Sequence, residues 1–328
     1  MIIFWIGVFV VALFALVKGA DWFLLASERT GLRLGMTPFA IGVVITGVGT
    51  SLPELASSVA AVLQGVPEIV AANVVGSNVA NILLIIGVAV TIGRKAVISK
   101  DLIDLELPLL AISTILFLGA AYDGAVSPIE AVLLLLAYGV YFVYAISHKE
   151  EFEAHLSDTV ERITEEAWVR RFKNGFLKEW AARRDYAMLI IGAAFLIIGA
   201  KYVIDSVIAL AEMLHIAVAV ITITAVAIGT SLPELVVSVR AALAKKFDIS
   251  VGNILGSNIF NALVIIGLPG IFTTLPLDPV THAIGLPFMA FATLLFIFSG
   301  ISRNLYNWEG LMFILLYILF VLKLLGIS

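Results

Sequence analysis

The feature that most constrains how this sequence can fold is a six-residue motif that sets a glutamate beside a proline within a long apolar stretch. The motif reads Gly-Thr-Ser-Leu-Pro-Glu at residues 49–54 and again at residues 229–234. A second motif, Gly-Ser-Asn-x-x-Asn, covers residues 76–81 and 256–261. Both motifs recur after the same interval of 180 residues (229 − 49 and 256 − 76), so we predict two related halves.

The composition indicates that most of the chain lies in lipid. It is 61% hydrophobic and 13% charged, with a mean hydropathy of +1.10, whereas a soluble domain is about half apolar and about a quarter charged. The net charge of −4 without a basic patch excludes a nucleic-acid partner. The absence of cysteine excludes disulfides, thiolate catalysis and cysteine metal sites. We predict an all-α integral membrane protein.

Apolar runs long enough to cross a bilayer are frequent, since a helical span needs roughly 20 mostly apolar residues. We predict ten spans, at about residues 2–26, 37–63, 68–92, 104–122, 128–147, 187–212, 217–243, 248–272, 283–301 and 308–326. Residues 1–147 then form a first five-span repeat and residues 187–328 a second, with a linker at 148–186.

Lys and Arg fall almost entirely in alternate loops, namely those after spans 1, 3, 5, 7 and 9. The positive-inside rule therefore places both termini outside the cell and the long linker in the cytoplasm, in a protein of the plasma membrane. Because each half has an odd number of spans, the second half enters the membrane in the opposite direction. Two inverted repeats with an ion site between them are a common plan for transporters.

The linker is rich in charge, and its apolar residues recur at helical spacing. Those residues are Phe152, Leu156, Val160, Ile163 and Ala167. This pattern favours an amphipathic helix on the membrane surface. A regulatory ion sensor would need a carboxylate-rich loop with a glycine turn, which the linker lacks.

The two motifs place oxygen-bearing side chains within predicted spans. Glu54 and Glu234 would provide carboxylates, and Asn81 and Asn261 amides. Further hydroxyls come from Thr50, Thr230, Ser77 and Ser257. Such oxygen ligands select hard cations such as Ca²⁺, Mg²⁺ and Na⁺. A zinc or copper site is disfavoured because all four histidines fall in predicted loops.

The prolines are predicted to kink spans 2 and 7. Pro53 and Pro233 lack a backbone N–H, and each ring crowds the carbonyl four residues back. Carbonyls released near residues 46–50 and 226–230 are further candidate cation ligands, since free backbone is tolerated at membrane depth only around a cavity or inside protein. Four motif glycines are predicted to let helices approach closely. They are Gly49, Gly76, Gly229 and Gly256.

Charge narrows the choice of ion. Two ionised glutamates carry −2, which one Ca²⁺ neutralises; without a cation, one of two carboxylates in a small site should hold a proton. Protons and cations should then compete. A single membrane glutamate, or the Gly-Ser-Asn triplets alone, could serve only helix packing, but the duplication favours ion binding. Charges at Lys18, Asp21, Lys201 and Asp205 are interpreted as snorkelling ends or local ion pairs.

The paired motifs resemble the α-repeats of the cation/Ca²⁺ exchanger superfamily, and most of all those of prokaryotic Na⁺/Ca²⁺ exchangers. The resemblance covers nearly the whole chain. It implies that Glu54 and Glu234 are the central ligands of Ca²⁺ and Na⁺, and that Ser77 and Ser257 serve flanking Na⁺ sites. It also implies ligands from the turn before each glutamate and from nearby backbone. These are Thr50, Ser51, Thr230 and Ser231, with carbonyls near Gly47 and Ala227.

The chain departs from the pattern at Asn261, where many members of the superfamily keep an aspartate. Two site carboxylates remain in place of three, which leaves open the Na⁺ count and any K⁺ co-transport. The expected function is Na⁺/Ca²⁺ antiport by alternating access, in which spans 1 and 6 slide across the others, without enzymatic activity, cofactor or protein partner. A Ca²⁺/H⁺ antiporter on the same fold is the first alternative, and a passive cation channel the second.

Overall fold

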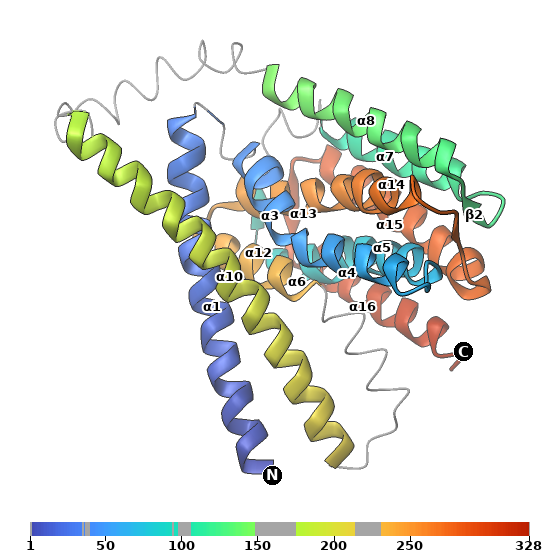
Figure 1. Cartoon of the computed structure of the whole chain (residues 1–328), viewed down its shortest axis with the longest axis horizontal. Helices are drawn as coiled ribbons and strands as arrows, with labels where there is room; N and C mark the ends of the chain where they lie inside the picture. The colour runs from blue at the N-terminus through green and yellow to red at the C-terminus, as the bar shows by residue number, and fades with distance from the viewer. Residues whose placement is uncertain are drawn as a thin grey trace.

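The structure is a computed structural model and describes residues 2–34, 36, 40–93, 95–97, 106–147, 175–213 and 231–327. The described part of the chain is mostly helical (Figure 1). Two long helices, α1 and α10, lie together on one flank of a body formed by the remaining helices. The predicted amphipathic pattern at 152–167 lies outside the described residues.

Helices α1 (Ile2–Arg33) and α10 (Gly175–Met213) pack along each other through glycines at corresponding places in the two halves. A Cβ atom on Gly19 would lie 2.8 Å from the main-chain nitrogen of Leu196, and one on Gly199 would lie 2.7 Å from that of Leu16. Neither position accommodates a larger residue at this spacing. The pair Gly19 and Gly199 is again separated by 180 residues.

The rest of the first half forms bent helices in the body. Its elements are η1 (Ile41–Gly47), α3 (Val48–Thr50), α4 (Leu52–Leu63), α5 (Glu68–Val79), η2 (Ala80–Ile86), α6 (Gly87–Gly93), α7 (Leu107–Ala120) and α8 (Pro128–Ser147). Elements η1 and η2 are π-helices, in which the backbone ladder shifts from four residues to five. Hydropathy does not distinguish π from α, so no sequence pattern predicts these turns.

The described second half has a similar succession of elements, with an additional π-helix, η6, before α15. It consists of α12 (Leu232–Leu243), α13 (Phe247–Phe260), η5 (Asn261–Ile265), α14 (Ile266–Gly270), η6 (Thr281–Gly285), α15 (Leu286–Ile301) and α16 (Asn307–Leu324). The π-helix η5 follows α13 as η2 follows α5. The main apolar core joins α5, η2, α13 and η5 with the outer helices, so the two Gly-Ser-Asn motifs lie at its centre.

The fold is mostly helical, as the all-α prediction requires, and four short strands add to the helices. Strand β1 (Lys95–Val97) pairs antiparallel with β4 (Asn304–Tyr306), and β2 (Ala125–Val126) pairs with β3 (Leu275–Pro276). Each pair satisfies backbone groups where a helix has ended. The pairing joins residues far apart in sequence, so local periodicity gives no sign of it.

Among the described helices, six are long and apolar enough to cross a membrane, or seven if the pair Ile41–Thr50 and Leu52–Leu63 is one bent span. Two shorter apolar helices, Leu107–Ala120 and Pro128–Tyr144, coincide with predicted spans four and five. The predicted seventh span at 217–243 is described only from residue 231.

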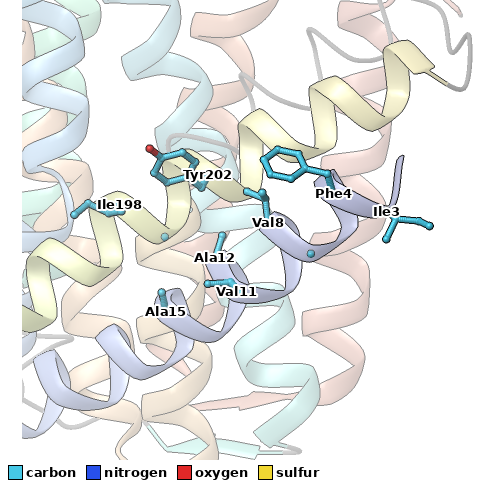
Figure 2. Close-up of a pocket in the computed structure, with 10 residues that line it drawn as sticks. Ile3, Phe4, Val8, Val11, Ala12, Ala15, Ile198 and Tyr202 are labelled. Atoms are coloured by element: carbon cyan, nitrogen blue, oxygen red, sulfur yellow. The ribbon is translucent and has the colours of Figure 1, made fainter. Parts of the chain in front are cut away.

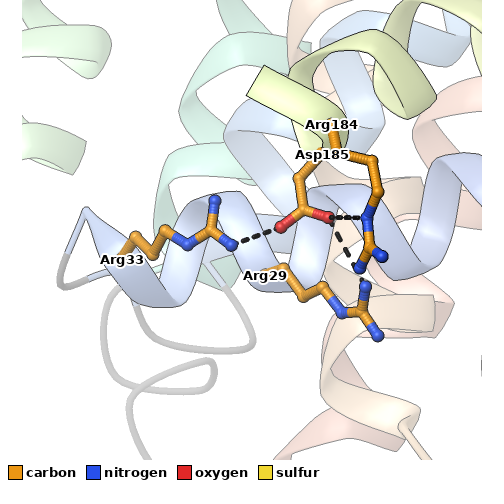
Figure 3. Close-up of polar contacts among 4 residues, drawn as sticks. All are labelled: Arg29, Arg33, Arg184 and Asp185. Atoms are coloured by element: carbon orange, nitrogen blue, oxygen red, sulfur yellow. Dashed lines mark hydrogen bonds and ion pairs between the residues drawn. The ribbon is translucent and has the colours of Figure 1, made fainter. Parts of the chain in front are cut away.

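Two helices extend beyond the predicted spans. Helix α1 continues to Arg33 rather than ending near residue 26, and α10 begins at Gly175, inside the predicted linker. Both extensions are polar, and ion pairs hold them together. Asp185 is 1% exposed and contacts Arg29 (3.4 Å) and Arg33 of the other helix (Figure 3). A prediction based on runs of apolar residues ends a span at such charges, although the helix itself continues beyond them.

Among the other charges near the ends of the predicted spans, one pair is the local ion pair that was expected. Lys201 and Asp205 form an exposed pair one turn apart on α10 at 2.6 Å. Asp21 of α1, in contrast, pairs with Arg240 of α12 rather than with a neighbour on its own helix. Glu28 of α1 pairs with Lys246, so α1 is also tied to the body.

The predicted role of the motif glycines is confirmed at Gly256 and wrong at Gly76. A Cβ atom on Gly256 would lie 2.4 Å from the carbonyl oxygen of Val43, whereas one on Gly76 would meet no atom within 4 Å. Helix α13 therefore packs tightly on η1. Gly229 lies outside the described residues.

A groove of about 660 Å³ separates α1 and α10 near the start of α1 (Figure 2). Its walls are apolar and include Phe4, Val8, Val11, Ile198 and Tyr202. The groove lies on the helix pair, outside the core that holds the motif carboxylates.

Candidate cation site

Glu54 and Glu234 occupy equivalent positions in the first turns of α4 and α12. Each is 1% exposed. A carboxylate in the first turn of a helix is favoured by the free N–H groups there. Both glutamates are therefore buried at helix starts, where the backbone favours negative charge and no described residue forms an ion pair with either carboxylate.

The predicted kink at Pro53 is confirmed. Ser51 leaves the helical conformation (φ −86°, ψ 2°), and the axes before and after it differ by 41°. The break turns Glu54 onto a new helix start rather than leaving it in a continuous span. Ser231, the equivalent residue before Pro233, has a similar conformation (φ −92°, ψ 11°), and the residues that precede it lie outside the described part.

The break also brings the two halves into contact. Ser51 Oγ donates a hydrogen bond of 3.1 Å to Glu234 Oε1, across 183 residues of sequence. Ser51 is the N-cap residue of α4, and Glu54 lies in the first turn of that helix. The hydrogen bond therefore joins the start of α4 to the start of α12, and each of these two helix starts carries one of the buried carboxylates.

Hydroxyls around Gly47 join the first half to α13. Thr50 Oγ1 lies 3.3 Å from the carbonyl oxygen of Gly47 and 3.2 Å from Asn253 Oδ1. Ser257 Oγ donates to the same Gly47 carbonyl at 3.2 Å. The Gly47 carbonyl oxygen therefore already accepts hydrogen bonds from hydroxyl groups. To bind a cation, this oxygen would need at least one of those hydroxyls to rotate away.

Several buried oxygens in this region have no hydrogen-bond partner among the described residues. They are Glu54 Oε2, Glu234 Oε2, Ser231 Oγ, Asn81 Oδ1 and Asn261 Oδ1. Leaving a buried polar atom unpaired costs free energy, so a cluster of such atoms requires a physical reason. All five are oxygens, and a hard cation is the partner that such a set fits.

The amides of Asn81 and Asn261 are held by two asparagines that the sequence interpretation did not assign to the site. Asn81 Nδ2 donates to Asn258 Oδ1 at 2.8 Å, and Asn261 Nδ2 donates to Asn78 Oδ1 at 3.0 Å. The available signal was the third residue of each Gly-Ser-Asn triplet, which is the same in both halves. A third missed residue, Asn253, donates its Nδ2 to Ser238 Oγ at 2.8 Å.

Ten of the twelve residues predicted for the site are described, and all ten are buried. They are Gly47, Thr50, Ser51, Glu54, Ser77, Asn81, Ser231, Glu234, Ser257 and Asn261. Thr230 and Ala227 lie outside the described residues. Within the described part of the chain no three His, Cys, Asp or Glu side chains form a cluster that could hold a metal ion.

A comparison with protein families places this geometry in context. The model of the sodium/calcium exchanger protein family matches residues 4–147 and 185–326. The chain belongs to the sodium/calcium exchanger family. The match covers both halves and leaves out most of the linker predicted at 148–186.

Individual relatives of this exchanger family span nearly the whole chain. The sodium/calcium exchanger MaX1 of Methanosarcina acetivorans is 34% identical over 339 residues, covering 94% of this chain and 95% of MaX1. The inner membrane protein YrbG of Escherichia coli is 30% identical over 289 residues, covering 88% and 86%.

A solved structure confirms that the fold is shared. The sodium-calcium exchanger NCX_Mj, soaked with 100 mM Na⁺ and 10 mM Sr²⁺, matches with a TM-score of 0.79 and 29% identity. The match covers 97% of this chain and 98% of that one. The resemblance drawn from the two motifs is thereby confirmed, and the chain is a membrane transporter rather than an enzyme.

Proposed function

We propose that this chain is a secondary antiporter that exchanges Na⁺ for Ca²⁺ across the plasma membrane. The observation that carries the proposal is the pair of buried carboxylates from the two halves, each with one oxygen unpaired among the described residues. Their combined charge of −2 matches one Ca²⁺. The names of MaX1 and NCX_Mj support the same pair of ions.

The finer architecture belongs to this proposal: ten spans arranged as two inverted five-span repeats, at 1–147 and 187–328, joined by a cytoplasmic linker. Contacts repeated across the 180-residue interval support it. Adding 180 to the residue numbers of β1 gives a range that contains β3, and adding 180 to those of β2 gives a range within β4. The pair β1–β4 in the structure is therefore the equivalent of the pair β2–β3. In the same way, Gly19 of α1 faces the backbone of α10, and the equivalent Gly199 of α10 faces the backbone of α1.

The site residues are proposed ligands in overlapping sites. Glu54 and Glu234 would bind both ions, while Asn81, Asn261 and Ser231 contribute the other unpaired oxygens. Thr50, Ser51, Ser77, Ser257 and Gly47 complete the described ligand set, with Thr230 and Ala227 from the second half. Because the ligands are shared, Na⁺ and Ca²⁺ compete, and alternating access converts that competition into exchange.

A Ca²⁺/H⁺ antiporter is the second candidate, since buried carboxylates also bind protons. The decisive measurement is ⁴⁵Ca²⁺ uptake into proteoliposomes under an imposed Na⁺ gradient at fixed pH, compared with an imposed pH gradient without Na⁺. Our proposal expects uptake driven by the Na⁺ gradient. Uptake that follows only the pH gradient would favour the second candidate.

Neutral variants test the carboxylates within the same assay. We expect Glu54→Gln and Glu234→Gln each to reduce Na⁺-driven uptake by at least roughly ten-fold, the lower end of the loss for weakened metal sites. Glu68→Gln is the matched control, because Glu68 is exposed in the first turn of α5. Normal uptake by both site variants would rule out these glutamates as ligands.

A further inference from the structure

Four buried asparagines form a closed hydrogen-bond network between α5–η2 and α13–η5. Asn78 and Asn258 stand opposite each other, and each donates its Nδ2 to the main-chain carbonyl of the other, at 3.1 and 3.3 Å. Their side-chain oxygens accept the Nδ2 groups of Asn261 and Asn81. All four residues are at most 2% exposed.

The polarity of this network is fixed by its two main-chain carbonyls. A carbonyl oxygen only accepts hydrogen bonds, whereas an asparagine amide has an accepting oxygen at one end and a donating NH₂ group at the other. Asn258 must therefore direct Nδ2 to the carbonyl of Asn78, because a flipped amide would set oxygen against oxygen. Its Oδ1 is then turned to Asn81.

The same constraint passes on to Asn81 and Asn261. Since Asn258 Oδ1 accepts, Asn81 must present Nδ2 to it, which leaves Asn81 Oδ1 facing away from the network. Asn78 imposes the same orientation on Asn261. Both outward oxygens, Asn81 Oδ1 and Asn261 Oδ1, are buried and have no partner among the described residues.

These outward oxygens belong to the elements that contact the glutamate helices. The π-helix η2, which carries Asn81, packs against α12, and η5, which carries Asn261, packs against α4. Helices α12 and α4 carry Glu234 and Glu54. In both halves the asparagine comes where α-helix gives way to π-helix, a local change often found at functional sites.

We propose that Asn78 and Asn258 are positioning residues, which hold Asn81 and Asn261 so that their amide oxygens rather than their NH₂ groups face the cations. The inference rests on the proposed cation site and adds to it the groups that determine its ligand orientation. An NH₂ group directed at a cation would repel it, so a flipped amide converts a ligand into a barrier. Outer groups that orient ligands commonly affect metal affinity by about 10- to 100-fold.

The first test is direct Ca²⁺ binding to the purified full-length protein in detergent, without any ion gradient. Asn258→Ala removes the acceptor of Asn81 Nδ2 and should weaken Ca²⁺ binding by about 10- to 100-fold. Asn73→Ala is the matched control, since Asn73 is half-buried on α5, five residues from Asn78. It should bind Ca²⁺ like the unmodified chain.

A double-mutant cycle separates orientation from simple loss of packing. An aspartate presents oxygen at either end, so Asn81→Asp needs no orienting partner. When Asn258 is intact, one carboxylate oxygen of the new aspartate faces Asn258 Oδ1, and the two oxygens repel each other. In the Asn258→Ala background that repulsion is absent. We therefore expect Asn81→Asp to strengthen Ca²⁺ binding at least about ten-fold more in the Asn258→Ala background.

Equal effects of Asn81→Asp in the two backgrounds would overturn the proposal, as would unchanged Ca²⁺ affinity in Asn258→Ala. If Asn258→Ala does not yield folded protein, the mirror-image cycle of Asn78→Ala with Asn261→Asp gives the same test. Failure of the unmodified chain to bind Ca²⁺ would instead contradict the proposed function, so the two failures are distinguishable.

Discussion

At the scale of single residues, the two glutamates are unusual because burial and charge are combined without a basic partner among the described residues. The Glu234 carboxylate accepts a hydrogen bond from a neutral group, the hydroxyl of Ser51. A neutral donor stabilises a carboxylate less than a cation does, and two such carboxylates repel each other. The pair is therefore suited to binding exchangeable cations rather than to a permanent salt bridge.

This arrangement predicts a pH dependence of Ca²⁺ binding. When pH falls, protons occupy Glu54 or Glu234, the site loses negative charge and Ca²⁺ affinity decreases; when pH rises, the reverse occurs. Na⁺-driven ⁴⁵Ca²⁺ uptake measured from pH 5 to pH 9 should therefore decrease toward the acid end. A flat profile over this range would contradict proton competition at the carboxylate pair.

At the scale of elements, the contact between α1 and α10 depends on small residues facing main chain. Gly19 and Gly199 allow the two helices to approach within van der Waals contact of each other's backbone. The ion pairs of Asp185 with Arg29 and Arg33 join the same helices at one end. Glycine packing and ion pairs therefore hold α1 and α10 together along their length and at one end.

Enlarging the glycine contact should separate the helices. Gly19→Val places methyl groups against the backbone of α10 and should destabilise the protein by about 1–3 kcal/mol, the usual cost of overpacking. Gly7→Val is the control on the same helix, because a Cβ atom on Gly7 meets no atom within 4 Å. Thermal unfolding in detergent measures both, and equal melting temperatures would argue against a tight contact at Gly19.

At the scale of the whole molecule, two strand pairs connect the halves. Strand β4 of the pair β1–β4 begins two residues after Ser302, and strand β2 of the pair β2–β3 begins two residues after Asp123. If the halves are inverted, these pairs lie on opposite sides of the membrane. The positive-inside rule assigns the Ser302 side to the cytoplasm.

Single-cysteine labelling can test that orientation cleanly because the chain has no cysteine of its own. Ser302→Cys and Asp123→Cys are both at exposed positions. In intact cells a membrane-impermeant maleimide should label only Asp123→Cys, and Ser302→Cys should react after permeabilisation. Labelling of both variants from the same side would rule out the inverted arrangement.

Much of this molecule was predictable because its strongest signals are local or repeated. The apolar runs predicted helices, and Pro53 predicted the kink. Helices α1 and α10 extend beyond the predicted spans, because Arg29, Arg33 and Asp185 form ion pairs that no local sequence pattern indicates.

The sequence by itself determined that two equivalent carboxylates lie in apolar surroundings with oxygen ligands nearby, because composition and spacing are properties of the chain. Only the tertiary structure decided which of those oxygens have no hydrogen-bond partner among the described residues. Asn78 and Asn258 act through carbonyls that are 180 residues away in sequence. The direction in which an amide points depends on such distant partners, and no local pattern records it.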